Sequence, residues 1–279
     1  MSGLWWSRLR EHTLARLLAL RHRSALDLFV RSAQAPQNAV DLFKGDWISS
    51  FPPEAGVTAG DRPLYDDPRL RWMLEQVPAT GRRVVELGPL EGSHTYQLLR
   101  AGAASVTALE SNGKSFLKCL VTKEVLRLDR ARYLCADFME WLTATPEHFD
   151  LCLASGVLYH MTEPLKMIGL ACARADVVFL WTHYYDESVL SRNPDQAHRF
   201  GPATELEWNG FRARGHHRSY GAQAWNPLHL GGKAAFSYWM TKDDIVAAFR
   251  HFGHTDITLG PEDLTHPAGP ALCLVAKKK

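Results

Sequence analysis

The sequence lacks the features that identify several common classes of protein. None of its 279 residues belong to an apolar stretch of about 18 residues, the length that a membrane-spanning helix needs. Neither sign of charge dominates, since 32 Lys and Arg face 30 Asp and Glu and leave a formal net charge of +2. The chain therefore has no global basic field that would attract nucleic acid, although a local basic patch stays possible.

Cysteine is scarce and shows no paired spacing. The five cysteines are far apart, without a Cys-x-x-Cys pair: Cys119, Cys135, Cys152, Cys172 and Cys273. A disulfide framework or a zinc site would need paired spacing, so we expect reduced, buried thiols and no metal. Arginines interrupt the N-terminal apolar residues, which excludes the hydrophobic core of a signal peptide. These features predict a cytoplasmic protein.

Short apolar runs alternate with helical patterns from residue 67 onward. This alternation predicts βαβ units and a Rossmann-like, doubly wound, mostly parallel sheet with helices on both faces. The expected strands are 83–88, 105–110, 133–136, 149–155, 176–182, 255–259 and 271–276, and the expected helices are 68–76, 93–100, 114–128, 163–173 and 242–251.

Residues 1–66 form an extension ahead of this domain. Leucines and arginines mixed over residues 1–34 predict a basic amphipathic helix, followed by a loop at 35–67. The helix could pack on the body of the protein or over its active site. Alternatively, Trp5 and Trp6 beside the arginines favour a helix at a membrane surface.

The alternation stops between residues 184 and 236. This long segment is rich in His, Arg, Trp, Tyr, Gly and Pro and shows no regular pattern. Long irregular segments within compact domains are usually functional or disordered, and the aromatic content argues against disorder. We interpret 184–236 as an insertion that covers a substrate.

A glycine-containing turn joins the first strand to its helix, in the order Glu86-Leu-Gly88-Pro89-Leu90-Glu91-Gly92. A dinucleotide would need Gly-x-Gly-x-x-Gly, and Leu90 stands where the middle glycine should be. A Gly-x-x-x-Gly turn after a carboxylate suits an adenosyl amino acid, whose amino group Glu86 could hold. The alternative is an ordinary strand–helix turn.

The next strand ends carry suitable groups as well. Glu110 ends the second strand, where a carboxylate can accept hydrogen bonds from ribose hydroxyls. After the third strand, Asp137 could bind the adenine amino group and Phe138 could stack on the ring. The alternatives are a solvated Glu110, a helix-capping Asp137 and a core Phe138. Ser155 and Gly156 end the fourth strand at the same edge.

At these residues the sequence resembles the class I S-adenosylmethionine-dependent methyltransferases, over roughly residues 67–279. The segment Ser155-Gly-Val-Leu-Tyr-His-Met-Thr-Glu-Pro164-Leu resembles more specifically the branch of the tRNA wobble-uridine carboxymethyltransferases. The resemblance implies S-adenosylmethionine or its carboxylated form as cofactor. It also implies a cofactor role for Tyr159 and for Lys44 upstream. Without the second glycine and with a different insertion, plain S-adenosylmethionine is the better assignment. The full predicted cofactor set is Lys44, Glu86, Gly88, Pro89, Glu91, Gly92, Glu110, Ser111, Asn112, Asp137, Phe138, Ser155, Gly156 and Tyr159.

Catalytic and substrate residues are expected beside the methyl group. His183 and His160 are candidate bases, because imidazole titrates near neutral pH, with Tyr159 next to them. Each histidine could instead be structural. The predicted substrate residues are Tyr184, Tyr185, Arg214, His217 and Tyr238.

Three functions are compatible with these patterns. The first is methylation of a small molecule at an O or N atom. The second is modification of an unstacked nucleobase, as the wobble-uridine resemblance implies, which would need a continuous basic surface. The third is a catalytically silent, cofactor-binding scaffold, which would show a damaged cofactor site. The near-neutral net charge argues against the second, and the intact acidic and glycine residues at the strand ends argue against the third, which leaves the first favoured.

Overall fold

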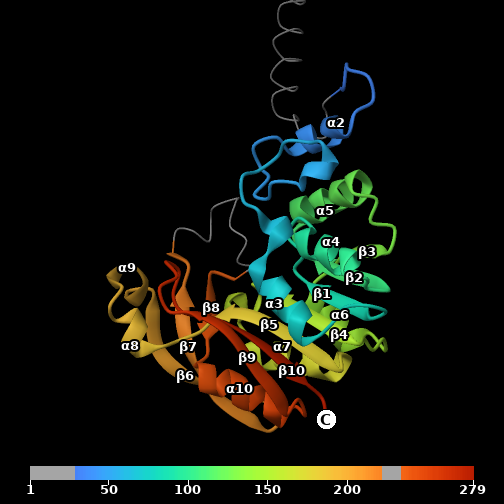
Figure 1. Cartoon of the computed structure of the whole chain (residues 1–279). Helices are drawn as coiled ribbons and strands as arrows, with labels where there is room; N and C mark the ends of the chain where they lie inside the picture. Colours follow the sequence, from blue (N-terminus) through green and yellow to red (C-terminus); the bar gives the residue numbers. More distant parts are fainter. Residues whose placement is uncertain (1–28, 222–233) are drawn as a thin grey trace, which may run out of the picture. The chain divides into compact units, whose positions relative to one another are not determined.

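A computed structural model of the chain describes residues 29–221 and 234–279 (Figure 1). These residues belong to two compact units, Met1–Arg62 and Pro63–Lys279. Most of the predicted N-terminal helix, residues 1–28, lies outside the described residues. The described part of that prediction, 29–34, is wrong, because these residues form no helix.

The first unit consists of short helical turns around an aromatic centre. Helix α2 (Pro36–Val40) leads into the 3₁₀ turns η2 (Asp41–Phe43) and, further on, η3 (Pro53–Ala55), within the segment predicted to be a loop. The Trp47 indole packs edge-on against Phe43 and Phe51, and its Nε1 donates a hydrogen bond to the Val40 carbonyl at 2.8 Å. Aromatic packing therefore orders a region that has little regular structure.

The second unit is built on a seven-stranded sheet in the order β3-β2-β1-β4-β5-β10-β9. Strands β1 to β5 are parallel, and β10 runs antiparallel to both β5 and β9. This order confirms the doubly wound, mostly parallel sheet. The strands are β1 (Arg83–Leu87), β2 (Ser105–Glu110), β3 (Ala131–Cys135), β4 (Leu151–Ser155), β5 (Val177–His183), β9 (Asp256–Asp263) and β10 (Ala271–Lys277).

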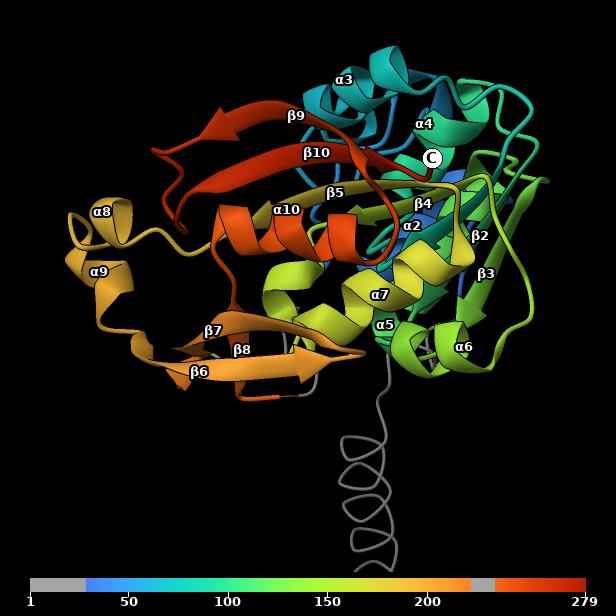
Figure 2. The same cartoon turned by 90° about the horizontal axis from the view of Figure 1, so that it is seen from below.

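Helices cover both faces of this sheet, as predicted (Figure 2). One hydrophobic cluster joins the sheet to α3, α4 and α5, and the other joins it to α6, α7 and α10. The turn η4 (Leu64–Asp66) precedes α3, and η5 (Leu158–His160) follows β4. The helices are α3 (Pro68–Gln76), α4 (Ser93–Arg100), α5 (Gly113–Val125), α6 (Phe138–Ala144), α7 (Pro164–Arg174) and α10 (Lys242–His251).

The predicted irregular insertion contains a second sheet. After the short helices α8 (Glu187–Leu190) and α9 (Pro194–Ala197), the strands β6 (Phe200–Trp208), β7 (Phe211–Ser219) and β8 (Phe236–Trp239) form an antiparallel sheet. Figure 2 shows this sheet beside α7 and α10. In β6 and β7 the glutamates and arginines share one face and alternate with less exposed residues, as in Arg212-Ala213-Arg214, so the interpretation as irregular chain was wrong.

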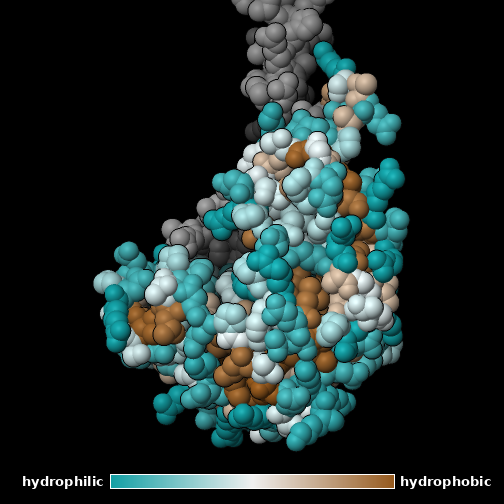
Figure 3. Space-filling view, viewed as in Figure 1, coloured by the Kyte–Doolittle hydropathy of each residue, from teal (hydrophilic) through white to brown (hydrophobic). Residues whose placement is uncertain are grey.

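The surface of the described residues is mostly hydrophilic. On the face shown in Figure 3, hydrophobic residues form separate areas within a largely polar surface. No helix within residues 29–221 or 234–279 is long and apolar enough to cross a membrane. All five cysteines are free thiols; four are buried, and Cys135 at the end of β3 is exposed, contrary to the expectation for buried thiols.

Candidate functional site

The turn after β1 takes the backbone conformation that its glycines suggested. Gly88 and Gly92 have φ of 66° and 82°, in the left-handed region, and Leu90 between them has a φ of 57°. A Cβ on Gly92 would lie 2.5 Å from the Tyr133 hydroxyl, so a side chain does not fit there. Leu90 thus adopts a glycine-like conformation despite its side chain, and the tight turn is retained.

Glu86 lies at the end of β1 with one oxygen unsatisfied. Its side chain is 1% exposed, and Oε2 accepts a hydrogen bond from the Thr95 hydroxyl on α4. Oε1 is buried and has no hydrogen-bond partner among the described residues. Burial raises the pKa of Glu86. A buried acceptor without a donor is costly, and an ammonium group of a ligand would satisfy it.

Glu110 at the end of β2 is held by backbone amides. Its Oε1 accepts from the Asn112 N–H at 2.8 Å, and its Oε2 accepts from the Leu90 N–H at 3.2 Å. Burial raises the pKa of Glu110, and hydrogen bonds from the backbone, including that of Ser111, oppose the rise. These bonds link the end of β2 to the glycine turn and do not use all four lone-pair sites of the carboxylate.

Glu91 and Pro89 belong to the interior of the turn. The Glu91 carboxylate is fully buried and pairs with the Lys118 ammonium of α5 at 2.6 Å. This ion pair ties the turn to α5, so the structure places Glu91 in a structural contact. Pro89 is buried, and its carbonyl accepts a hydrogen bond from Gly92 N–H at 2.8 Å.

Asp137 and Phe138, which follow β3, take the alternative roles of a helix cap and a core residue. Asp137 caps α6 and accepts a hydrogen bond from the Met139 N–H at 2.9 Å. Phe138 is 9% exposed and packs in the core cluster with Leu109 and Leu142. Helix α6, which the sequence reading missed, begins with this cap.

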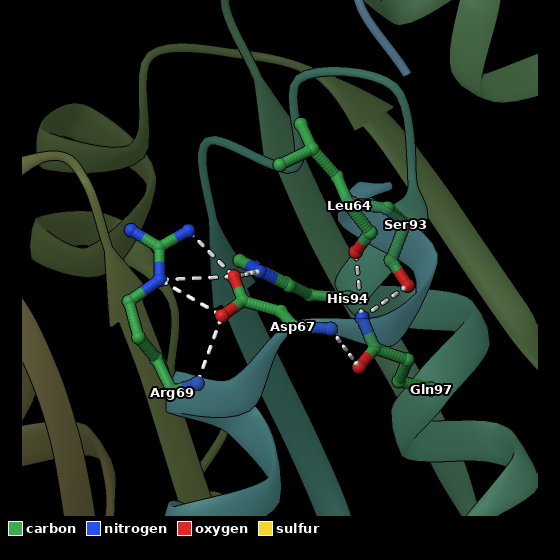
Figure 4. A network of polar contacts seen from close by, with 6 residues as sticks. All are labelled: Leu64, Asp67, Arg69, Ser93, His94 and Gln97. Carbon is green, nitrogen blue, oxygen red and sulfur yellow. Dashed lines mark hydrogen bonds and ion pairs between the residues drawn. The ribbon is translucent and has the colours of Figure 1, made fainter. Parts of the chain in front are cut away.

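A polar network joins α3 and α4 beside the glycine turn (Figure 4). Asp67, 2% exposed, accepts from His94 Nε2 at 2.9 Å and from the Arg69 guanidinium. Burial raises the pKa of Asp67, but the bonds from His94 and Arg69 outweigh it and lower the pKa overall. Gln97 completes the network by donating to the Leu64 carbonyl and accepting from Asp67 N–H.

Arg69 extends this network to the next strands. Its guanidinium lies 4.1 Å from the ring centroid of Trp181 near the end of β5. Neither Arg69 nor His94 was singled out from the sequence, because both lie in ordinary amphipathic helices. The Asp67-Pro68-Arg69 helix start is the signal that could have drawn attention to them.

Aromatic rings converge at the carboxyl ends of β4 and β5. The Tyr159 ring lies 4.7 Å from His183, 5.9 Å from Trp181 and 6.2 Å from Trp239 of β8. The turn formed by Ser155 and Gly156 precedes Tyr159; Gly156 has a φ of 82°. Burial raises the pKa of Tyr159 to about 12, so its hydroxyl stays protonated at neutral pH.

His183 is buried in this cluster as a neutral imidazole. Its Nδ1 lies 2.9 Å from the Gly269 carbonyl, so this nitrogen carries the proton and donates it. Burial, and then the nearby His266, lower the pKa of His183 to about 4. Its ring stacks on Trp239 with centroids 5.3 Å apart and an interplanar angle of 5°. Nε2 is therefore left as a proton acceptor.

His160 takes part in a different contact. Its Nδ1 lies 2.6 Å from the Tyr220 hydroxyl, and that hydroxyl is 3.3 Å from Ser237 Oγ. The three side chains connect η5, the end of β7 and β8. His160 thus anchors the small sheet to the chain that follows β4.

The predicted substrate residues are not all on one surface. His217 and Tyr238 face each other across β7 and β8 on the face opposite that of Trp239, because neighbouring strand residues alternate in direction. Tyr184 is buried, and its hydroxyl donates to Glu262 at 2.7 Å.

Two further predicted substrate residues lie near the surface. Tyr185 stacks on His216 with centroids 3.4 Å apart, and Arg214 is exposed on β7. Arg218 lies on the Trp239 side of the small sheet. Lys44 belongs to the first unit, where it follows η2 and is exposed.

The comparisons with solved structures identify this architecture. The N-terminal domain of EvdMO1, crystallised in the presence of SAH and D-fucose, superposes with a TM-score of 0.66 at 24% identity, over 87% of this chain and 95% of that one. Magnesium protoporphyrin IX methyltransferase from Synechocystis PCC 6803, with bound SAH, gives a TM-score of 0.50 at 17% identity, over 75% and 80%. The chain has a class I methyltransferase fold.

The sequence comparisons agree with the resemblance found in the motifs. The tRNA U34 carboxymethyltransferase of Ectopseudomonas mendocina is 33% identical over 86 residues, which are 31% of this chain. The match spans only about a quarter (26%) of the length of that relative. No family model matches the chain. This methyltransferase fold therefore resembles the U34 branch over a limited segment.

Proposed function

We propose that the chain is an S-adenosylmethionine-dependent methyltransferase that acts on a small molecule at an O or N atom. The observation that carries the proposal is the buried, unpartnered Oε1 of Glu86 at the end of β1. It lies beside a turn with two left-handed glycines and one strand away from the amide-held Glu110. A damaged cofactor site, as in a silent scaffold, would not keep this set.

The residues present fit the parts of the cofactor. Glu86 accepts the ammonium of its amino acid, and Glu110 accepts the ribose hydroxyls with its remaining lone pairs. When bound, the cofactor would supply a sulfonium methyl group for attack by a lone pair on O or N, with the electrons of the broken C–S bond returning to sulfur. The proton that the acceptor loses can pass to Nε2 of His183, which is neutral and unprotonated.

Calorimetry with the Glu110→Ala variant tests the proposal. Loss of the hydrogen bonds to the ribose should weaken the binding of S-adenosylmethionine by about 1–3 kcal/mol, which raises its Kd about 5- to 150-fold. Glu124→Ala, an exposed glutamate on α5, is the matched control and should bind as the unchanged protein does. If the unchanged protein binds neither S-adenosylmethionine nor S-adenosylhomocysteine, the proposal fails.

The U34 resemblance favours a second candidate, transfer of a carboxymethyl group to a nucleobase. It rests on the 33% identity to the tRNA U34 carboxymethyltransferase named above. Mass spectrometry of the nucleoside that remains bound through purification separates the two candidates. Plain S-adenosylmethionine or its product favours the first, and the carboxylated form favours the second.

A further inference from the structure

Arg218 of β7 is a buried cation without a counter-ion. Its side chain is 7% exposed, it forms no ion pair with a carboxylate of the described residues, and its Nε is buried without a hydrogen-bond partner. Arginine does not lose its proton in proteins, so the charge persists. Burying an uncompensated charge is unfavourable, and folds that keep one usually use it.

The neighbours of Arg218 offset its charge only in part. The guanidinium carbon lies 5.0 Å from the Trp239 ring centroid and 5.1 Å from that of Tyr220. Aromatic faces attract a cation, and the Tyr220 hydroxyl bonds to the Arg218 side chain, but neither group carries a full negative charge. Burial lowers the pKa of Arg218, Tyr220 opposes this fall, and the charge of Arg199 adds to it. The surroundings thus favour the arrival of an anion.

The same rings connect Arg218 to the proposed methyl-transfer site. Trp239, which the guanidinium covers, also stacks on His183. Tyr220 bonds to His160 after β4. The cation therefore shares aromatic neighbours with residues at the carboxyl ends of β4 and β5, where the acceptor of a methyl group would lie.

We infer that Arg218 binds the carboxylate of the acceptor, which is a planar aromatic acid; this inference rests on the proposed function. A planar carboxylate pairs with the edge of a guanidinium in two parallel hydrogen bonds. Tyr159 and Trp181, which are half-buried at the carboxyl ends of β4 and β5, provide flat apolar surfaces for the ring of such an acid.

Benzoate and its neutral isostere benzamide test the inference on the full chain saturated with S-adenosylhomocysteine. Calorimetry should show benzoate binding at least tenfold more tightly than benzamide. Arg218→Met should remove that difference while the Kd for S-adenosylhomocysteine changes less than twofold. Arg212→Met is the matched control on the same strand, because Arg212 is exposed and already paired with Glu205 and Glu207.

Thermal unfolding gives a readout that a purely structural role would not produce. Removing an uncompensated charge should raise the Tm of Arg218→Met without ligand, whereas a structural arginine would lower it on replacement. Equal binding of benzoate and benzamide to the unchanged protein, or a lower Tm for Arg218→Met, overturns the inference.

Two further arms separate the possible sources of failure. If Arg218→Met weakens the binding of carboxylated S-adenosylmethionine more than that of the plain form, Arg218 binds a carboxylate of the cofactor. Its assignment to the acceptor is then wrong. If the unchanged protein binds no S-adenosylhomocysteine, the proposed function fails. In that case, comparing the binding of benzoate and benzamide to the protein without cofactor tests whether Arg218 binds an anion, independently of the proposed function.

Discussion

At the scale of single residues, Glu86 combines a structural cost with the binding role proposed above. Because burial raises its pKa, the folded chain holds this proton more tightly than the unfolded chain does. Stability is then lost as the pH rises above the pKa of the unfolded chain, 4.5 for this carboxyl group. Without a ligand, Glu86 therefore destabilises the fold at neutral pH.

Replacing Glu86 with glutamine should reverse that effect. We expect Glu86→Gln to raise the free energy of unfolding at pH 7 by about 1–3 kcal/mol without cofactor, and to weaken S-adenosylmethionine. Thermal melts between pH 4 and 8 measure the first effect, which should grow with pH, and calorimetry measures the second. Glu75→Gln, at an exposed position, should change neither. A lower stability at every pH would contradict the prediction.

His183 should give the opposite dependence on pH. Its pKa is lowered from 6.5 to about 4, so the unfolded chain gains a proton in this range before the folded chain does. Stability should fall by about 3 kcal/mol as the pH drops from 6.5 to 4, and then level off. His183→Gln should remove this slope in melts across that range. The control variant His148→Gln, at an exposed position, should keep the loss of stability between pH 6.5 and 4. If His183→Gln keeps it as well, His183 is not the group responsible.

Individual site residues were predictable only where the chain itself carries the pattern. Glu86, Gly88, Gly92 and Glu110 follow directly after short apolar runs, so position along a strand identified them. Arg218 has its role through contacts with Trp239 and Tyr220 that only folding creates.

At the scale of secondary structure, the glycine turn and the start of α4 depend on backbone conformation. Gly92→Ala should destabilise the fold by about 1–2 kcal/mol from its φ of 82° alone, with a further cost from contact with Tyr133. Gly113→Ala at the start of α5 is the control, because its Cβ would meet nothing within 4 Å. Chemical denaturation measures both; equal stabilities would show that the turn tolerates a side chain.

The network around Asp67 should stabilise the junction of α3 and α4. Asp67→Asn removes the partner of Arg69 and His94 and should cost about 2–3 kcal/mol. Asp66→Asn, its exposed neighbour paired with exposed Arg71, should change stability by less than about 0.5 kcal/mol. Chemical denaturation compares the two variants through their midpoints, provided that the dependence of the unfolding free energy on denaturant concentration is the same in both. Similar losses in both variants would argue against a special role for the buried carboxylate.

Most elements of the Rossmann-like sheet were predictable because parallel strands are continuous apolar runs between amphipathic helices. Helices α3, α4 and α10 begin and end at the predicted residues. The small sheet was missed because its strands are rich in charged residues, which resemble loop composition in the sequence. In the structure these charges share one face, where Glu205 and Glu207 of β6 pair with Arg212 of β7.

At the scale of the whole molecule, ligand binding should be visible as stabilisation. A ligand that binds only the folded chain adds about 2.7 kcal/mol when its concentration is 100 times Kd. S-adenosylhomocysteine should therefore raise the Tm by several degrees, with a continuing rise at higher concentration. ATP, which shares the adenosine but has no amino acid for Glu86, serves as the control. An equal rise with both ligands would show that recognition stops at the nucleoside.

The overall architecture could be predicted from the alternation of apolar runs and helices. The pairing of β5 with β10, which lie on either side of the insertion in the sequence, could not. Strand β10 returns antiparallel beside β5, and the pairing depends on contacts between segments about 90 residues apart, such as His183 with Ala271. Local sequence carries no signal for such a pairing.

The insertion has one consequence for how chains with this fold could diversify. The residues proposed to hold the cofactor come from the first half of the parallel sheet, while Arg218 and Trp239 come from strands added after β5. If the proposed roles hold, mutations in the added strands alter which acceptor is chosen and leave the methyl donor untouched. Selection can act on the two recognition tasks separately, so related chains could exchange acceptors through changes in this one module.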